Sequence, residues 1–81
     1  MRIEDRLESA SNFEAWKLHM LMMLRLQKLI TVVENAPKYN KTDEWEADNI
    51  KAMELLVDGV KDHLLPIITK LESAYEMFKT L

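Results

Sequence analysis

The pattern of apolar and polar positions predicts that most of this chain is helical. Apolar residues recur at intervals of three and four, the spacing that places side chains on one face of an α-helix. No segment shows the strict alternation that indicates a β-strand, and Met1 to Leu7 is at most an extended or frayed lead-in. Gly59, Pro37 and Pro66 stand near the expected helix boundaries. The sequence therefore predicts an all-α fold, a small orthogonal bundle of about four helices without a sheet.

The first predicted helix covers about residues 12–34 and carries two apolar sets with helical spacing. The first set is Phe13, Trp16, Met20, Met23, Gln27 and Ile30. The second set is Leu18, Met22, Leu26, Leu29 and Val33. A helix that is apolar on two sides is either the central element of a bundle or has one face in the core and another against a partner chain. The second set is therefore the candidate interface.

Capping residues predict where the next two helical segments begin. Thr42 or Asp43 is expected to cap a second helix, which ends or loosens near Gly59. Beyond this glycine, Asp62 is expected to cap a third segment. We expect that segment to be short or bent, because Pro66 has no amide hydrogen to donate.

A last helix is predicted near the end of the chain, because Thr69 and Glu72 have the spacing of a capping box. We therefore divide the chain into a lead-in at residues 1–11 and a helical domain at residues 12–81. The large side chains on the helical faces are expected to anchor the core, and the tryptophan N–H groups are expected to find partners at its edge. These core anchors are Phe13, Trp16, Trp45, Leu56, Tyr75 and Phe78.

Composition indicates one small globular domain with a modest core. The chain has 81 residues, of which 48% are hydrophobic and 31% are charged. A domain of this size removes roughly 60% of the unfolded chain's surface from water. We therefore expect apolar surface on the first helix to remain uncovered. The methionines are either core side chains or the lining of a groove or an oligomer contact.

Charge and cysteine content exclude several classes of function. A net charge of -3 argues against binding to nucleic acid through its phosphates, which needs clustered Lys and Arg. The lack of cysteine excludes disulfides and thiolate chemistry and suits a reducing compartment, so a cytoplasmic location is expected. The apolar stretch at residues 18–33 is interrupted by His19, Arg25, Gln27 and Lys28, so we expect no membrane span.

No residues show the spacing of a catalytic or metal site. His19 and His63 are far apart in the sequence and lack the partners of known zinc motifs. The acidic pair Asp43 and Glu44 stands in the first turn of a predicted helix, where negative charge favours the helix dipole. The serines lack a nearby base that would activate a nucleophile. We therefore expect no enzyme activity, no cofactor and no metal.

Three signatures in this order resemble the Gag polyprotein of copia-type LTR retrotransposons. The first is Ser11–Trp16 (SNFEAW), although Ala10 stands where the family usually has glycine. The third is Ala74–Leu81 (AYEMFKTL). The second signature consists of Asp43–Glu46 (DEWE), Ala52, Leu55, Leu56 and Asp62–Pro66 (DHLLP). The resemblance covers about residues 7–81.

The resemblance implies the N-terminal helical half of a capsid-like domain, which packs against copies of itself to help build a retrotransposon particle. It implies no active site, and no direct contact with RNA by this segment, since the family's zinc knuckle is not among these residues. It also implies a longer protein, because the family's helix continues past Leu81. An alternative is a domesticated capsid-like adaptor that binds a peptide or a partner helix in an apolar groove. The expected partner is thus a second copy of the chain or such a peptide.

Overall fold

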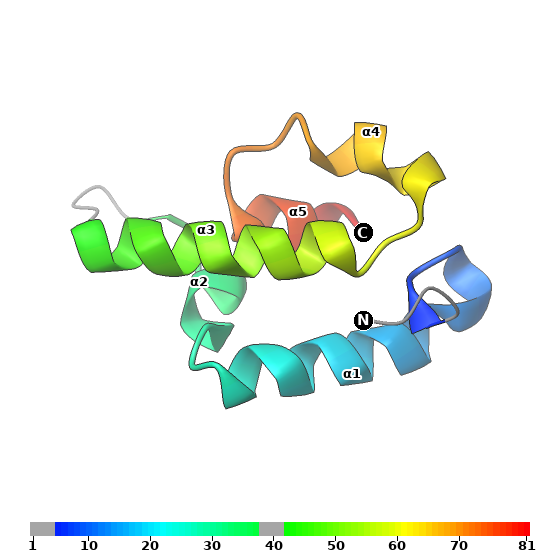
Figure 1. The fold of residues 1–81 in the computed structure, drawn as a ribbon, viewed down its shortest axis with the longest axis horizontal. Helices are drawn as coiled ribbons and strands as arrows, with labels where there is room; N and C mark the ends of the chain where they lie inside the picture. The colour runs from blue at the N-terminus through cyan, green and yellow to red at the C-terminus, as the bar shows by residue number, and fades with distance from the viewer. Residues whose placement is uncertain (1–4, 38–41) are drawn as a thin grey trace.

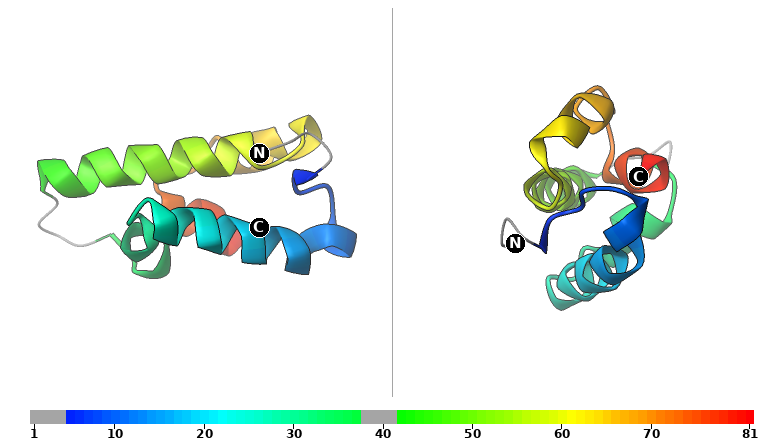
Figure 2. Two further views of the ribbon diagram at one scale, coloured as in Figure 1. Left: turned by 60° about the horizontal axis from the view of Figure 1, so that its bottom comes forward. Right: turned by 90° about the vertical axis from the view of Figure 1, so that its right-hand side faces the viewer.

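The computed structural model of the protein describes residues 5–37 and 42–81. Within these ranges the fold is all-α without a strand, which confirms the predicted small helical bundle. The elements are η2 (Ala10–Asn12), α1 (Phe13–Leu26), α2 (Ile30–Glu34), α3 (Asp43–Asp58), η3 (Asp62–Leu64), α4 (Leu65–Ile68) and α5 (Ala74–Thr80). Helices α1 and α3 run in roughly opposite directions, and α2 runs across them (Figure 1). Figure 2 shows α3 and α5 between α4 on one side and α1 on the other.

The first predicted helix is two helices in the structure, which corrects the single helix expected there. After α1 ends, Lys28 adopts the left-handed conformation with a φ of 59°. Its N–H donates to the Arg25 carbonyl at 3.0 Å, and the Leu29 N–H donates to the Leu24 carbonyl at 2.7 Å. These two bonds form the Schellman motif that commonly ends helices, here with lysine in the position that favours glycine. The side chains of Leu24 and Leu29 are both buried, as the motif's usual apolar contact requires.

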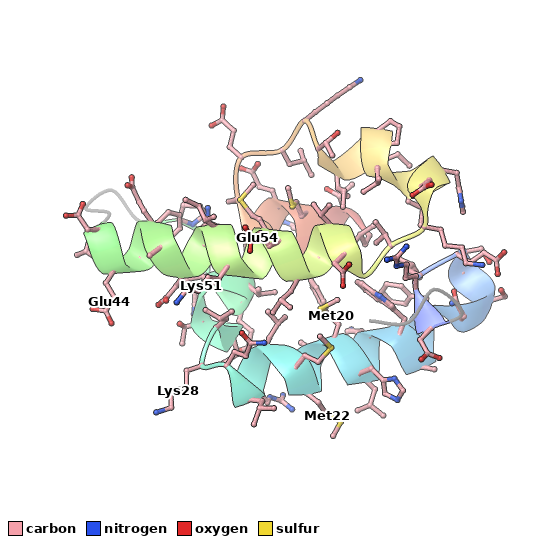
Figure 3. All side chains as sticks on the ribbon, in the orientation of Figure 1. Met20, Met22, Lys28, Glu44, Lys51 and Glu54 are labelled. Carbon is pink, nitrogen blue, oxygen red and sulfur yellow. The ribbon has the colours of Figure 1, made fainter. Side chains whose placement is uncertain are left out.

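This break divides the candidate interface into exposed and buried residues. Leu18, Met22 and Leu26 are 58%, 57% and 84% exposed, whereas Leu29 and Val33 are only 2% and 4% exposed. The prediction that Leu29 and Val33 belong to an interface is therefore wrong. The left-handed residue redirects the chain, so α2 does not continue the helical phase of α1. Figure 3 shows Met22 on α1 pointing away from α3.

Helix α1 approaches the end of α3 closely inside the core. The indole Nε1–H of Trp16 donates to the Gly59 carbonyl at 2.6 Å, and the Trp16 ring centroid lies 6.0 Å from those of Phe13 and Phe78. A Cβ on Gly59 would lie 2.5 Å from Cε of Met20. Gly59 has a φ of -90°, so its role is to allow this close approach rather than a special backbone conformation.

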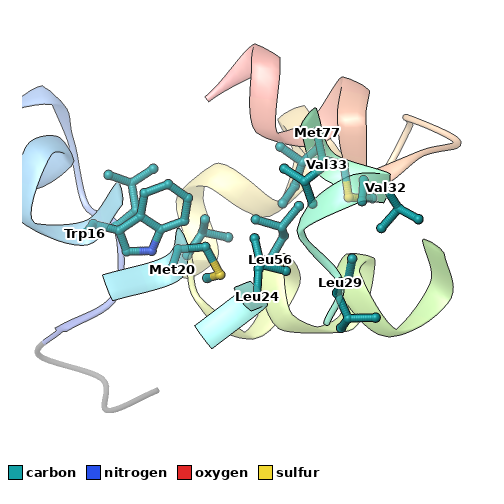
Figure 4. Close-up of a cluster of buried hydrophobic side chains, with 13 residues drawn as sticks. Trp16, Met20, Leu24, Leu29, Val32, Val33, Leu56 and Met77 are labelled. Carbon is teal, nitrogen blue, oxygen red and sulfur yellow. The ribbon is translucent and has the colours of Figure 1, made fainter. Parts of the chain in front are cut away.

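The predicted core anchors differ in how deeply they are buried. Trp16 and Leu56 are fully inside, and Figure 4 shows both among the buried side chains. Phe13, Trp45 and Phe78 are partly buried and pack against the core from its edge. Tyr75 is half-buried, and the Lys79 ammonium lies 5.7 Å from its ring centroid. The buried apolar residues include Leu7, Trp16, Met20, Leu24, Leu29, Val32, Val33, Ala52, Leu56, Val60, Ile68, Ala74 and Met77.

The lead-in contributes to this core, which the sequence pattern does not indicate. Leu7 is 3% exposed and forms an isolated parallel bridge with Val60. Its N–H donates to the Gly59 carbonyl at 2.8 Å, and its carbonyl accepts from the Lys61 N–H at 2.9 Å. The boundary predicted after residue 11 therefore does not separate the lead-in from the packed domain. Residues 1–4 of the predicted lead-in lie outside the described residues.

The start of α3 agrees with the sequence pattern, whereas the cap predicted at Asp62 is wrong, because Asp62 lies inside η3 and Lys61 is the N-cap of that element. Thr42 is the N-cap of α3, since its hydroxyl accepts from the Trp45 N–H at 3.0 Å, which decides between the two predicted caps. Helix α4 has four residues and contains Pro66 in its first turn, where a missing amide leaves no bond unmade. The third helical segment is therefore short, as predicted.

The capping box predicted at Thr69 is wrong, because α5 begins later, at Ala74. Its N-cap is Ser73, whose hydroxyl accepts from the Glu76 N–H at 3.2 Å. A second acceptor comes from α3, where Oδ1 of Asn49 accepts from the Ala74 N–H at 2.8 Å. Two backbone N–H groups in the first turn of α5, which have no acceptor within the helix, thus donate to side chains outside it. Asn49 acts over 25 residues of sequence, which no local spacing rule detects.

Candidate functional site

The most conspicuous exposed apolar surface is a row on α1, which we call the outer stripe and define as Leu18, Met22 and Leu26. These residues follow one another at intervals of four, so their side chains lie along one ridge of the helix. All three are more than half exposed. Exposed apolar residues scattered singly need no explanation, whereas three that adjoin in one row form a patch that a partner could cover. The outer stripe is therefore the first candidate contact surface.

The outer stripe has a basic surrounding. Arg25 is exposed and stands three residues after Met22, so it neighbours the stripe on the helix surface. Lys28 is also exposed and follows the C-terminal end of the stripe. Residues 13–28 contain three Lys or Arg and one acidic residue, Glu14. The surface around the stripe thus combines apolar side chains with net positive charge.

A groove of about 600 Å³ lies along α3 on the side of α4, and we call it the α3–α4 groove. Helix α3 contributes Ile50, Met53 and Val57, and Leu65 of α4 lies opposite. This volume is within the roughly 300–1,000 Å³ of typical ligand pockets. Among the described residues, the lining consists of Arg6, Ile50, Met53, Glu54, Val57, Asp58, Val60, Asp62, Leu65, Thr69 and Met77.

The edge of the α3–α4 groove is acidic. Among the described residues, Glu54, Asp58 and Asp62 line it together with the cation of Arg6. The Arg6 guanidinium donates to Oδ1 of Asp58 at 3.5 Å, a long and exposed contact that contributes little to stability. Nε of Arg6 is buried without a hydrogen-bond partner. Over its full length α3 carries six Asp or Glu and one Lys, Lys51. The groove therefore combines an apolar floor with net negative charge.

A second groove, of about 440 Å³, lies between the lead-in, α4 and the end of α5. Its apolar lining includes Phe13, Leu64 and Ile67, and Ile67 is 51% exposed. The polar edge is formed by Ser9, Glu14 and Thr80 among others. Within the described part of the chain, Glu14 is the one lining residue with an ionisable side chain, so the acidic series of the α3–α4 groove is not repeated there.

His63, which was considered as a metal ligand, makes a hydrogen bond to the backbone instead. Nε2 of His63 lies 2.8 Å from the Glu8 carbonyl oxygen, which can only accept, so this nitrogen carries the proton. The Lys61 ammonium pairs with the Glu8 carboxylate at 3.4 Å.

Among the described residues, no three His, Cys, Asp or Glu side chains come together in a group that could hold a metal ion. No helix within the described ranges is long and apolar enough to span a membrane.

Sequence reasoning identified one of these three surfaces. It found the outer stripe, but it did not find the α3–α4 groove. A detectable signal was present, because apolar Ile50, Met53 and Val57 share a face of α3 with acidic Glu54 and Asp58. The methionines divide between the two predicted roles, since Met20 is in the core and Met53 lines the groove.

Comparison of this chain with known protein families, with curated proteins and with solved structures gives no match in any of the three. Its function is therefore inferred from its own residues and surfaces. The surfaces that bear on it are the outer stripe, which is apolar and basic, and the α3–α4 groove, which is apolar and acidic.

Proposed function

We propose that this chain is a non-enzymatic structural domain of the Gag capsid type, which associates with further copies of itself through apolar helix faces to help build a retrotransposon particle. The observation that carries self-association is the outer stripe, because Leu18, Met22 and Leu26 remain 57–84% exposed after folding. The capsid role comes from the three signatures that resemble copia-type Gag. A cytoplasmic location is part of the proposal, since a chain without cysteine suits a reducing compartment.

The size of the outer stripe suits weak contacts that are repeated many times. Complete burial of one such side chain contributes about 1.5–3 kcal/mol. Association of two proteins costs at least roughly 4 kcal/mol in lost translational and rotational freedom. Three side chains therefore do little more than offset this cost, so a single contact is weak. A shell in which every copy makes several such contacts gains stability from their number.

Sedimentation velocity over a range of protein concentrations tests the proposal. The wild-type chain is expected to associate as its concentration rises, and Leu26→Glu is expected to stay monomeric because it places a charge in the stripe. Ile67→Glu is the matched control, since Ile67 is 51% exposed but lies on α4, away from the stripe. Unchanged far-UV circular dichroism establishes that both variants fold. A wild-type chain that stays monomeric at high concentration contradicts the proposal, as does a Leu26→Glu variant that associates like the wild type.

A second candidate function is a domesticated capsid-like adaptor, and the α3–α4 groove favours it. An apolar floor with a polar edge is the usual form of a groove that accepts an amphipathic helix or peptide. The adaptor predicts a strict monomer that binds one peptide with saturation. Concentration-dependent association without peptide binding favours the structural role instead.

A further inference from the structure

We infer that the outer stripe of one copy docks into the α3–α4 groove of a second copy, so that the chains associate head to tail. This inference rests on the proposed self-association and names the second surface that takes part in it. The occupant of the groove is then a helix of another copy, α1, with Leu18, Met22 and Leu26 as its apolar contacts.

Charge complementarity is the first argument for this pairing. The outer stripe is accompanied by Arg25 and Lys28, whereas the groove is edged by Glu54 and Asp62. Among the described residues, the structure gives no salt bridge to Glu54 or to Asp62. Complementary charges at the edge of an apolar contact steer association and fix its register. The basic helix of one copy and the acidic groove of the next therefore attract each other.

The alternative pairing, stripe against stripe, is disfavoured by the same charges when the two helices run parallel. A two-fold contact between two parallel α1 helices would bring Arg25 and Lys28 close to their own copies, and like charges at an interface are repulsive. It would also bury little surface, because three such side chains supply only about 200–350 Å² per partner. Stable interfaces bury roughly 800 Å² per partner. Insertion of α1 into a concave groove adds the groove walls to the contact area.

The spacing of residues on the two helices supports insertion. Leu18, Met22 and Leu26 form a ridge with a four-residue interval on α1. On α3 the groove is lined by Met53 and Val57, which also stand four residues apart. Rows with this spacing interdigitate when two helices cross at about -50°. The half-buried, unbranched side chain of Met53 is able to adjust its shape to the incoming ridge.

The two surfaces lie on different sides of the molecule, which determines the kind of assembly. Helix α1 and helix α4 are on opposite sides of the layer formed by α3 and α5 (Figures 1 and 2). A chain can therefore use its outer stripe and its groove at the same time, each with a different neighbour. Contacts of this heterologous type build rings when the rotation closes and filaments when it does not.

Two single variants and their mixture test the head-to-tail contact. Leu26→Glu disables the stripe and leaves the groove intact. Ile50→Glu disables the groove and leaves the stripe intact, and Ile50 is 58% exposed, so the charge is tolerated in the folded chain. Each variant alone is expected to be monomeric, with association weakened by about tenfold or more. An equimolar mixture is expected to form a one-to-one heterodimer that does not grow further, as measured by sedimentation velocity.

A charge exchange provides an independent measurement at exposed positions. Glu54→Lys is expected to weaken association by about tenfold, and adding Arg25→Glu to the same chain is expected to restore it, because every head-to-tail contact then holds the exchanged pair. Ile67→Glu is again the control and is expected to associate like the wild type. Association of the wild type is also expected to weaken as NaCl rises from about 0.05 to about 0.5 M.

The possible results separate this inference from the proposed function. If Ile50→Glu and Glu54→Lys associate like the wild type while Leu26→Glu is monomeric, the head-to-tail contact is wrong and self-association stands. A mixture of the two glutamate variants that stays monomeric also overturns it. A wild-type chain that is monomeric at every concentration removes both the inference and the proposed function.

Discussion

Replacement of Asn49 by alanine tests how the structure starts α5. Asn49 is 6% exposed, and its Oδ1 accepts from the Ala74 N–H at 2.8 Å. Ala74 has no exposed surface, so in the wild-type packing its amide depends on this acceptor rather than on water. Asn49→Ala therefore leaves a buried amide donor without a partner. The hydroxyl of Ser73 still accepts from the Glu76 N–H, so α5 keeps one of its two side-chain caps.

The expected loss follows from three contributions. A buried donor left without a partner costs about 1–3 kcal/mol. The bonds from Nδ2 of Asn49 to the Glu72 carbonyl at 3.5 Å and to Sδ of Met53 at 3.3 Å are weak or long, so their loss adds little. Alanine is a better helix former than asparagine, and in α3 this offsets about 0.5 kcal/mol. We expect a net loss of about 0.5–2.5 kcal/mol in the free energy of unfolding.

Urea unfolding followed by circular dichroism measures this loss, and amide hydrogen exchange at Ala74 locates it. For a domain of this size, 2 kcal/mol lowers the Tm by about 8–16 °C. Asn35→Ala is the matched control, because Nδ2 of Asn35 donates to the Thr31 carbonyl at 3.0 Å in an exposed position. The control is expected to cost less than about 0.5 kcal/mol. If Asn49→Ala costs no more than Asn35→Ala, the cross-helix cap does not hold α5.

Two further substitutions test the close approach at Gly59 and the helix break at Lys28. Gly59→Ala places a Cβ 2.5 Å from Cε of Met20, so we expect a loss of about 1–3 kcal/mol in urea unfolding. Adding Met20→Leu removes the clashing atom and is expected to recover part of the loss; no recovery would contradict the steric explanation. Lys28→Gly relieves the left-handed conformation and is expected to stabilise the chain by about 1 kcal/mol, or about 4–8 °C in Tm. Lys28→Ala keeps the strain, so an equal gain from alanine would show that the conformation is not its cause.

The candidate contact surfaces could be predicted from the sequence only in part. The outer stripe follows from a four-residue spacing that is visible along α1, and its exposure follows from the small number of helices available to cover it. Leu29 and Val33 have the same spacing, yet they are buried. The difference comes from Lys28, because lysine gives no local signal for a left-handed residue and the break at this position sets a new direction for α2.

Features that depend on near neighbours in the chain could be predicted from the sequence. The helical character, a cap at Thr42 or Asp43 and the short segment around Pro66 each depend on hydrogen bonds or steric limits within about four residues. Because these local interactions do not depend on the tertiary fold, the sequence pattern is enough to predict them.

Features that join distant parts of the chain could be seen only in the folded structure. The indole of Trp16 donates to the Gly59 carbonyl, which is 43 residues away in the sequence. Asn49 caps a helix 25 residues away, and Leu7 packs into the core beside Val60. Whether these polar groups are buried and hydrogen-bonded depends on which surfaces meet when the helices pack. Helical spacing in the sequence does not specify which surfaces those are. The α3–α4 groove exists for the same reason, since its two walls come from elements that are adjacent only in the folded chain.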